Sequence, residues 1–150
     1  MYKHILISTD GSDVAQKGVD HGLSLAKAIG AKVTIVTVTE RFPFYPGSMT
    51  GAGWIPGPNE MADYEAGQKK WASEVLVGVK AAADKLDVEA ETLHVPDALP
   101  AEAIIETAKS RGCSLIVMSS HGRRGLGRLL LGSQTSEVLA HSPVPVLVVR

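Results

Sequence analysis

The sequence predicts a doubly wound α/β fold, in which a five-stranded parallel sheet is covered by helices on both faces. Short apolar runs alternate with helical patterns along the 150 residues, and near-continuous apolar strands are typical of a parallel sheet that is buried on both sides. Two strands end in polar segments with glycine, residues 8–12 and 119–122. Because ligands bind where the strand order reverses, we expect these two strands to be neighbours, in the order 3-2-1-4-5.

The first half of the chain alternates strand and helix signals. Ser12 is a suitable N-cap and Gly30 a suitable stop for a helix between two β-rich runs. Apolar residues recur at helical spacing between them: Ala15, Val19, Leu23, Ala26 and Ile29. The elements expected here are a strand at 5–7, this helix, a strand at 33–38 and a long helix over about 60–86.

The second half repeats this alternation. Pro100 suits a helix start, and Gly112 ends the helix. Pro143 and Pro145 lack a backbone N–H, which places the last strand at a sheet edge. The elements expected here are an edge strand at 88–95, a helix with the face Ala101, Ile104, Ile105 and Ala108, a strand at 115–118, a helix marked by Leu131, Thr135, Val138 and Leu139, and a strand at 144–149.

Residues 41–59 break the pattern, because they are dense in Pro, Gly and aromatic residues and show no periodicity. A loop of this length inside a compact domain is usually functional or disordered. It follows the second strand, on the expected ligand side of the sheet. It is therefore interpreted as a mobile insertion, a lid over the ligand or a surface for a partner.

Composition excludes several classes of protein. The chain is long enough for one domain, residues 1–150, and 45% hydrophobic residues suffice for a core. A net charge of −1 without a basic stripe argues against a general nucleic-acid binder. No apolar run approaches the roughly 18 residues of a membrane span. With one cysteine and no signal-peptide pattern at the start, we expect a cytoplasmic protein.

The segment 115–133 points to a phosphate-bearing small molecule, in the first place a nucleotide. A strand is followed by a glycine-rich loop with three arginines, and Gly132 and Ser133 then open the last helix. Glycines let backbone N–H groups face a ligand, and the first N–H groups of a helix have no intrahelical partner. The segment is neither a Walker A loop nor a dinucleotide fingerprint. The alternative is that the glycines only form a turn and the arginines are solvated.

Other polar residues leave their roles open. Asp10 is suited either to bind ribose hydroxyls or to cap the following helix. Asp97 is suited to a nucleotide or to a cap on the helix at Pro100, and the cap is favoured. His121 lies inside the glycine loop, where it either contacts phosphate or orients the loop. The remaining histidines lack metal-ligand spacing, Cys113 has no base beside it and no nucleophile elbow is present, so the sequence predicts no metal site and no catalytic residue.

The sequence resembles the universal stress protein family over essentially all 150 residues, most closely in the opening residues 5–38 and the closing residues 118–149. ATP-binding members of that family carry glycine, two residues, glycine, nine residues, and then glycine with serine or threonine. This chain has Ser119, Gly122, Gly132 and Ser133 at those places. The chain departs from this motif at Ser119, which stands in place of the first glycine. A serine can occupy this position if its φ angle is negative.

The resemblance implies an adenine-nucleotide α-hydrolase-like fold, ATP with or without Mg²⁺, and a homodimer through the last strand. It places Asp10 near the ribose and Val38 against the adenine. The residues implied for nucleotide binding are Ser8, Thr9, Asp10, Val38, Met118, Ser119, Gly122, Arg123, Gly132, Ser133, Gln134 and Thr135.

The function implied is an ATP-binding regulatory or stress-response protein with slow or no hydrolysis. One alternative is a dimeric interaction module without a nucleotide. The other is an adenylating or ATP-hydrolysing enzyme, which is disfavoured because residues 9–13 lack a double glycine.

Overall fold

The computed structural model describes residues 1–42, 56–121 and 131–150. The elements follow in the order β1 (His4–Ser8), α1 (Asp13–Ile29), β2 (Lys32–Val38), α2 (Pro58–Lys85), β3 (Ala90–Val95), α3 (Pro100–Ser110), β4 (Leu115–Ser119), α4 (Ser133–His141) and β5 (Val146–Val149). All strand pairs are parallel, and the strand order is β3-β2-β1-β4-β5. The predicted fold class and strand order are confirmed.

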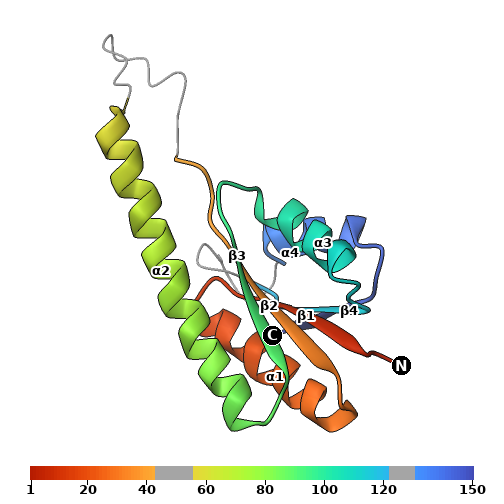
Figure 1. Ribbon diagram of the computed structural model, residues 1–150. Helices are drawn as coiled ribbons and strands as arrows, with labels where there is room; N and C mark the ends of the chain where they lie inside the picture. Colours follow the sequence, from red (N-terminus) through yellow and green to blue (C-terminus); the bar gives the residue numbers. More distant parts are fainter. Residues whose placement is uncertain (43–55, 122–130) are drawn as a thin grey trace.

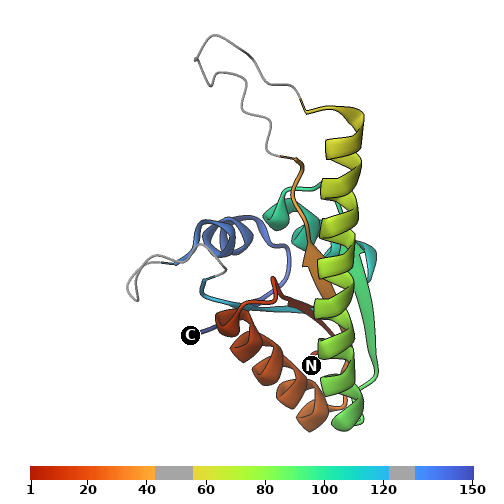
Figure 2. The ribbon, with the colours of Figure 1, turned by 90° about the vertical axis from the view of Figure 1, so that its left-hand side faces the viewer.

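The sheet separates two helical layers (Figures 1 and 2). Helices α1 and α2 cover one face and enclose a core around Ile7, Val33 and Ile35. Helices α3 and α4 cover the other face, where Leu6 and Ile116 are buried. Across residues 1–42, 56–121 and 131–150, every helix is too short or too polar to span a bilayer.

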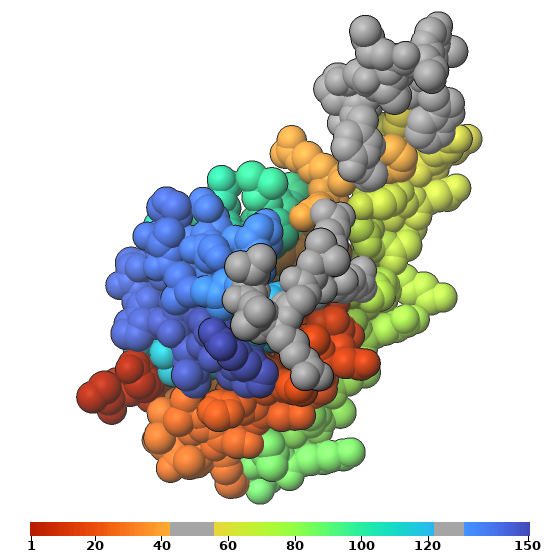
Figure 3. Space-filling view, turned by 180° about the vertical axis from the view of Figure 1, so that it is seen from behind, coloured from red at the N-terminus to blue at the C-terminus, as the bar shows by residue number. Residues whose placement is uncertain are grey.

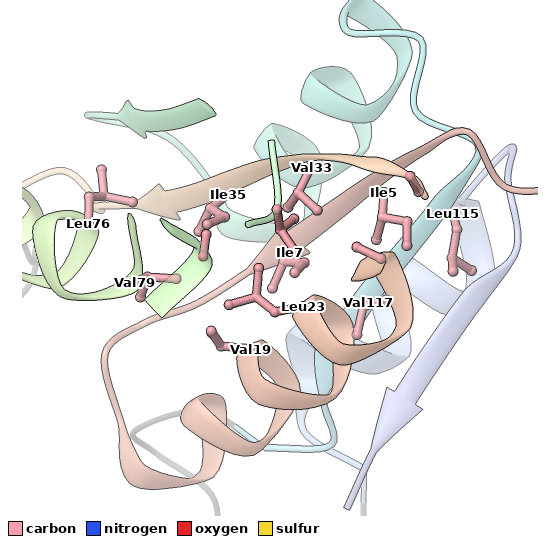
Figure 4. Packing of buried hydrophobic residues seen from close by; sticks show 14 residues of the cluster. Ile5, Ile7, Val19, Leu23, Val33, Ile35, Leu76, Val79, Leu115 and Val117 are labelled. Atoms are coloured by element: carbon pink, nitrogen blue, oxygen red, sulfur yellow. The ribbon is translucent and has the colours of Figure 1, made fainter. Parts of the chain in front are cut away.

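Helix α1 forms as the sequence predicts. The Ser12 hydroxyl accepts a hydrogen bond from the Ala15 N–H at 3.1 Å, and Gly30 ends the helix with a φ of 69°. Leu23 points from α1 into the core toward the sheet (Figure 4). A Cβ at Gly22 would lie 2.6 Å from the Ile7 side chain. Glycine at this position therefore lets α1 approach β1 closely.

Several local predictions differ from the structure: the third strand begins at Ala90 rather than at 88, the last helix begins at Ser133, after Leu131, and two further differences have a clear cause. Asp97 does not cap α3, because the N-cap residue is Leu99 and the Asp97 carboxylate instead pairs with Arg41 at 2.9 Å. Asp97 also has a positive φ of 55°. The last strand begins at Val146 rather than at 144, because the Val144 N–H donates to the Ser142 hydroxyl in a local turn.

Candidate functional site

A cavity of about 500 Å³ lies at the carboxyl ends of β1, β2 and β4, where the strand order reverses. Helices α2, α3 and α4 contribute further parts of its wall, and Ala15 of α1 and several loop residues also line it. Ten of the twelve residues implied for nucleotide binding line it: Ser8, Thr9, Asp10, Val38, Met118, Ser119, Gly132, Ser133, Gln134 and Thr135. The other two, Gly122 and Arg123, lie outside the described residues.

Asp10 orders the turn that leads from β1 into α1. Its Oδ1 accepts a hydrogen bond from the Ser12 N–H at 3.0 Å, while Ser12 itself provides the helix cap. The carbonyl of the neighbouring Thr9 accepts from the Thr37 hydroxyl at 3.0 Å, which fixes this turn to β2. The carboxylate is thus held in a defined position on the cavity wall.

Ser119 fits where the family motif has glycine. It is the last residue of β4, and among the described residues only Asp87 and Asp97 have a positive φ without being glycine. Its hydroxyl donates to the His121 carbonyl at 2.7 Å, and its own carbonyl accepts from the buried Thr135 hydroxyl at 3.0 Å. The serine therefore stabilises the turn after β4 without backbone strain.

Gly132 allows the start of α4 to lie against the turn that follows β4. Its N–H donates to the Ser120 carbonyl at 2.8 Å. A Cβ at this position would lie 3.2 Å from the same carbonyl oxygen and 3.5 Å from the His121 Cα. Because both neighbours are backbone atoms, a larger side chain would push the two segments apart.

The first turn of α4 presents backbone donors at the cavity wall. Gly132 is the N-cap and contributes no side-chain bond, and the first intrahelical bond is from the Ser136 N–H to the Gly132 carbonyl. Within the described part of the chain, the N–H groups of Ser133, Gln134 and Thr135 have no acceptor. Such a helix N-terminus favours an anion.

The Gln134 side chain links two helix starts. Its Oε1 accepts a hydrogen bond from the Ala101 N–H in the first turn of α3, at 3.0 Å. The Leu99 N-cap offers no side-chain acceptor, so Gln134 satisfies one of the donors that a capping side chain would have satisfied. The side-chain amide of Gln134 thus fixes α4 against α3, and its backbone N–H has no acceptor in the described residues.

His121 lines the cavity, and its ring is oriented from one side. Its Nδ1 lies 2.9 Å from the Ser120 hydroxyl. Its Nε2 is buried and has no partner within residues 1–42, 56–121 and 131–150. The ring therefore both supports the turn and offers one nitrogen to the interior.

Helix α2 contributes three residues to the cavity that the sequence analysis did not single out, namely Tyr64, Gln68 and Trp71. They occupy one face of the helix, since residues three and four apart are neighbours on a helix. All three are partly exposed. Their spacing along the helix was the signal in the sequence that could have predicted that this face of α2 contacts a cavity or a ligand.

Burial shifts the pKa values of His94 and Cys113 in opposite directions. Burial, helped by the charge of Lys69, lowers the pKa of His94, whose Nε2 lies 2.7 Å from the Thr39 hydroxyl near the cavity. Burial raises the pKa of the Cys113 thiol, which suits an inert core residue. In the described residues, no three His, Cys, Asp or Glu side chains gather as a metal site would require.

Comparison with known proteins identifies a family for this fold and cavity. A model of the universal stress protein family matches residues 1–150. The universal stress protein YxiE of Bacillus subtilis is 34% identical over 150 residues, which are 100% of this chain and 100% of that relative. The universal stress protein MJ0531 of Methanocaldococcus jannaschii is 33% identical over 150 residues, which are 100% of this chain and 83% of that relative.

Solved structures agree with the fold. The hypothetical protein MJ0577, whose biochemical function was assigned from its structure, superposes with a TM-score of 0.77 at 26% identity, covering 99% of this chain and 96% of that one. A universal stress protein in complex with cAMP (TM-score 0.67, 24% identical, 99% and 97% covered) and one from Archaeoglobus fulgidus in complex with dAMP (0.69, 20%, 99% and 98%) share the same architecture. This chain belongs to the universal stress protein family.

Proposed function

We propose that this protein binds ATP at the carboxyl edge of its sheet and acts as a regulatory protein in which the nucleotide is a conformational ligand. The observation that carries the proposal is the first turn of α4, whose N–H groups border the same cavity as Asp10 and Val38. Donors for phosphate and a carboxylate for ribose hydroxyls thus share one site. Two proteins of the same fold were solved with adenine nucleotides, which makes these the first ligands to test.

In this proposal, some groups of the chain bind the nucleotide and others hold the binding turn in shape. The N–H groups of Ser133, Gln134 and Thr135 bind phosphate, together with two residues of the preceding loop. These are Gly122, a fixed position of the family motif, and Arg123, which falls between its fixed positions. The hydroxyl of Thr135 and the N–H of Gly132 instead bond the carbonyls of residues 119 and 120. They therefore hold the phosphate-binding turn in shape and do not contact the ligand. Ser8, Thr9, Met118 and Ser119 line the space beside the sugar.

ATP would supply phosphate charge and an adenine ring to this site. We propose that its hydrolysis is slow or absent. Among the described residues, His121 lines the cavity with an Nε2 that has no partner, and it is the candidate base that we propose to test. No cluster of carboxylates for a metal accompanies it there. We expect turnover far below the roughly 10 per second of a median enzyme, with or without Mg²⁺.

Calorimetric titration and thermal unfolding with ATP and with GTP test the proposal. ATP is expected to bind more tightly than GTP, and a concentration 100 times its Kd is expected to stabilise the fold by about 2.7 kcal/mol. No response to millimolar ATP by either method would refute the proposal and favour a nucleotide-free interaction module. A brisk Mg²⁺-dependent ATPase that is lost in His121→Ala would favour an enzyme.

We also propose a homodimer through β5, in the cytoplasm. Strand β5 lies at the sheet edge, its side chains are partly exposed, and the blue C-terminal residues reach the surface beside the orange residues of α1 (Figure 3). An apolar edge strand invites pairing with a second copy about a two-fold axis.

Light scattering at micromolar concentration tests the dimer. We expect twice the mass of one chain for the natural protein and for Thr92→Lys, a control on the opposite edge strand β3. We expect the mass of one chain for Val148→Lys, because this change places a charge on the proposed interface. A natural protein with the mass of one chain, or a dimeric Val148→Lys, would reject this interface.

A further inference from the structure

We infer that Gln68 selects the nucleobase, by presenting an amide oxygen that accepts a hydrogen bond from the exocyclic amine of adenine, and that Tyr64 sets the direction of this amide. The inference rests on the proposed function, and it adds a side chain of α2 to the strand-end residue Val38 in recognition of the base. It predicts discrimination between ATP and GTP that two side chains control.

The geometry begins at the end of β2. The Tyr64 hydroxyl lies 3.4 Å from the Glu40 carbonyl oxygen and 2.7 Å from the Gln68 Nε2. The Tyr64 ring also packs edge-on against Phe42, with ring centroids 5.0 Å apart and an interplanar angle of 74°. Tyr64, Gln68 and Glu40 all border the cavity next to Val38. The tyrosine is therefore fixed between the chain after β2 and the neighbouring amide.

The direction of the hydrogen bonds follows from the chemistry of each group. A carbonyl oxygen only accepts, so the single hydroxyl hydrogen of Tyr64 is donated to Glu40. In this arrangement the phenolic oxygen accepts, and Gln68 presents its NH₂ group to it. With the nitrogen committed in this way, the Oε1 of Gln68 is the acceptor that this side chain offers to a ligand.

An acceptor at this position distinguishes purines. Adenine carries an amine at position 6, which donates, whereas guanine carries a carbonyl there, which accepts. Guanine would bring two acceptors together and leave both without a partner, which costs more than the absence of a favourable contact. Gln68 lines the cavity and is linked through Tyr64 to Glu40, two residues after Val38, the residue implied for the adenine end of the nucleotide.

Trp71 provides a probe of this site that is independent of any activity. It lines the cavity three residues after Gln68. The other tryptophan of the chain is Trp54. In a Trp54→Phe background, fluorescence comes from Trp71 alone, and a purine that enters the cavity is expected to change its emission.

The experiment compares the Kd values for ATP and GTP in this background with those of two variants. Gln68→Met keeps the length of the side chain and removes the acceptor, and Tyr64→Phe removes the hydroxyl that directs the amide. In both, the preference for ATP over GTP is expected to fall by about three- to tenfold, chiefly through weaker ATP binding. The control is Gln16→Met on α1, where the glutamine bonds Asp20 on the exposed helix surface; its preference is expected to stay unchanged.

The outcomes separate this inference from the proposed function. If the Trp54→Phe protein binds ATP and Gln68→Met keeps the same preference, the inference is wrong and ATP binding stands. If Tyr64→Phe keeps the preference while Gln68→Met loses it, the role of Tyr64 is wrong and that of Gln68 stands. If neither nucleotide binds the Trp54→Phe protein or the natural protein, both proposals fall together. Partly exposed positions on α2 tolerate both changes, and thermal unfolding without a ligand confirms that each variant is folded.

Discussion

Both ends of the sheet carry polar residues. At one end their hydrogen bonds join protein groups to one another, and at the other end they lead to N–H groups beside a cavity. At the amino end, the Thr34 hydroxyl is 2.8 Å from the His4 Nε2 and donates to Glu91 at 2.6 Å, while Arg111 donates to the other Glu91 oxygen at 3.0 Å. At the carboxyl end, the network around residues 119–121 leads to the N–H groups at the start of α4, which border a cavity.

This difference separates a structural network from a binding site. At the amino end, Thr34 is fully buried and joins β1 to β3 across β2, so its bonds hold the strands together. At the carboxyl end, hydrogen bonds position a turn beside the first N–H groups of α4, which have no acceptor in the described residues. Because open N–H groups at a helix start favour an anion, this end of the sheet is the one suited to a ligand.

The largest effect is expected from Gly132→Val. Its side chain would meet the Ser120 carbonyl, separate α4 from the turn after β4, and lower ATP affinity by at least about 100-fold. Gly57→Val is a matched control, because Gly57 is also an N-cap glycine with extended backbone, and among the described residues the nearest atom to its position for a Cβ is the Glu60 Oε2 at 3.9 Å. Calorimetry with ATP measures both variants, and equal affinities would show that the glycine at 132 serves no ligand.

The next largest effect is expected from Thr34→Val at the other end of the sheet. It leaves the Nε2–H of His4 buried without an acceptor and removes a donor to Glu91, so the free energy of unfolding should fall by about 1–3 kcal/mol. ATP affinity should not change. Thr92→Val, on the exposed side of β3, is the control, and denaturant unfolding is the measurement. A loss of ATP affinity in Thr34→Val would contradict the separation of the two ends.

A smaller, pH-dependent effect is expected from His4. Burial is the largest cause that lowers its pKa in the folded protein below the ordinary 6.5, and Lys32 adds to it, whereas Glu91 opposes it. Below pH 6.5 the unfolded chain therefore binds more protons at this residue, so its contribution to stability falls as pH falls. Arg111 also faces the ring.

His4→Gln keeps an N–H donor for Thr34 and cannot titrate. Between pH 7.5 and 5.5, the natural protein is expected to lose more unfolding free energy than this variant. Parallel urea titrations at the two pH values measure the difference, and identical losses would show that His4 does not titrate as its surroundings dictate.

The smallest effect is expected at Cys113. Its thiol is buried and its pKa is raised, so few thiolates form. Iodoacetamide should leave the folded protein unmodified under conditions in which the urea-unfolded chain reacts fully, as mass spectrometry can show. Reaction at equal rates would mean that this side of the sheet opens readily.

Local signals in the sequence were sufficient for most of the fold. Ser12, Gly30 and the β-rich runs predicted the elements, and the polar ends of the first and fourth strands predicted the order of the sheet. The cap on α3 was not predictable, because Gln134 reaches Ala101 from a helix 33 residues away. Asp97 was assigned that role from its position alone, and the distant Arg41 holds it instead.

The candidate site was predictable where it follows a motif and not where it depends on packing. The residues after β1 and β4 lie together at the cavity, as expected for neighbouring parallel strands. Tyr64 and Gln68 reach it because α2 extends beyond the sheet (Figure 1), and helical periodicity alone does not show which face of a long helix meets a cavity.

The central claim, that ATP binds through the start of α4, is tested most directly by the backbone amide signals of an isotope-labelled protein in a nuclear magnetic resonance titration. With ATP, the largest shifts are expected at Ser133, Gln134 and Thr135, whose N–H groups lack acceptors in the described chain, and little change is expected at Thr34 and Glu91. Saturable shifts confined to the start of α4 and the cavity would support the account. Unchanged amides at Ser133 and Gln134, at ATP concentrations that shift signals elsewhere, would contradict it.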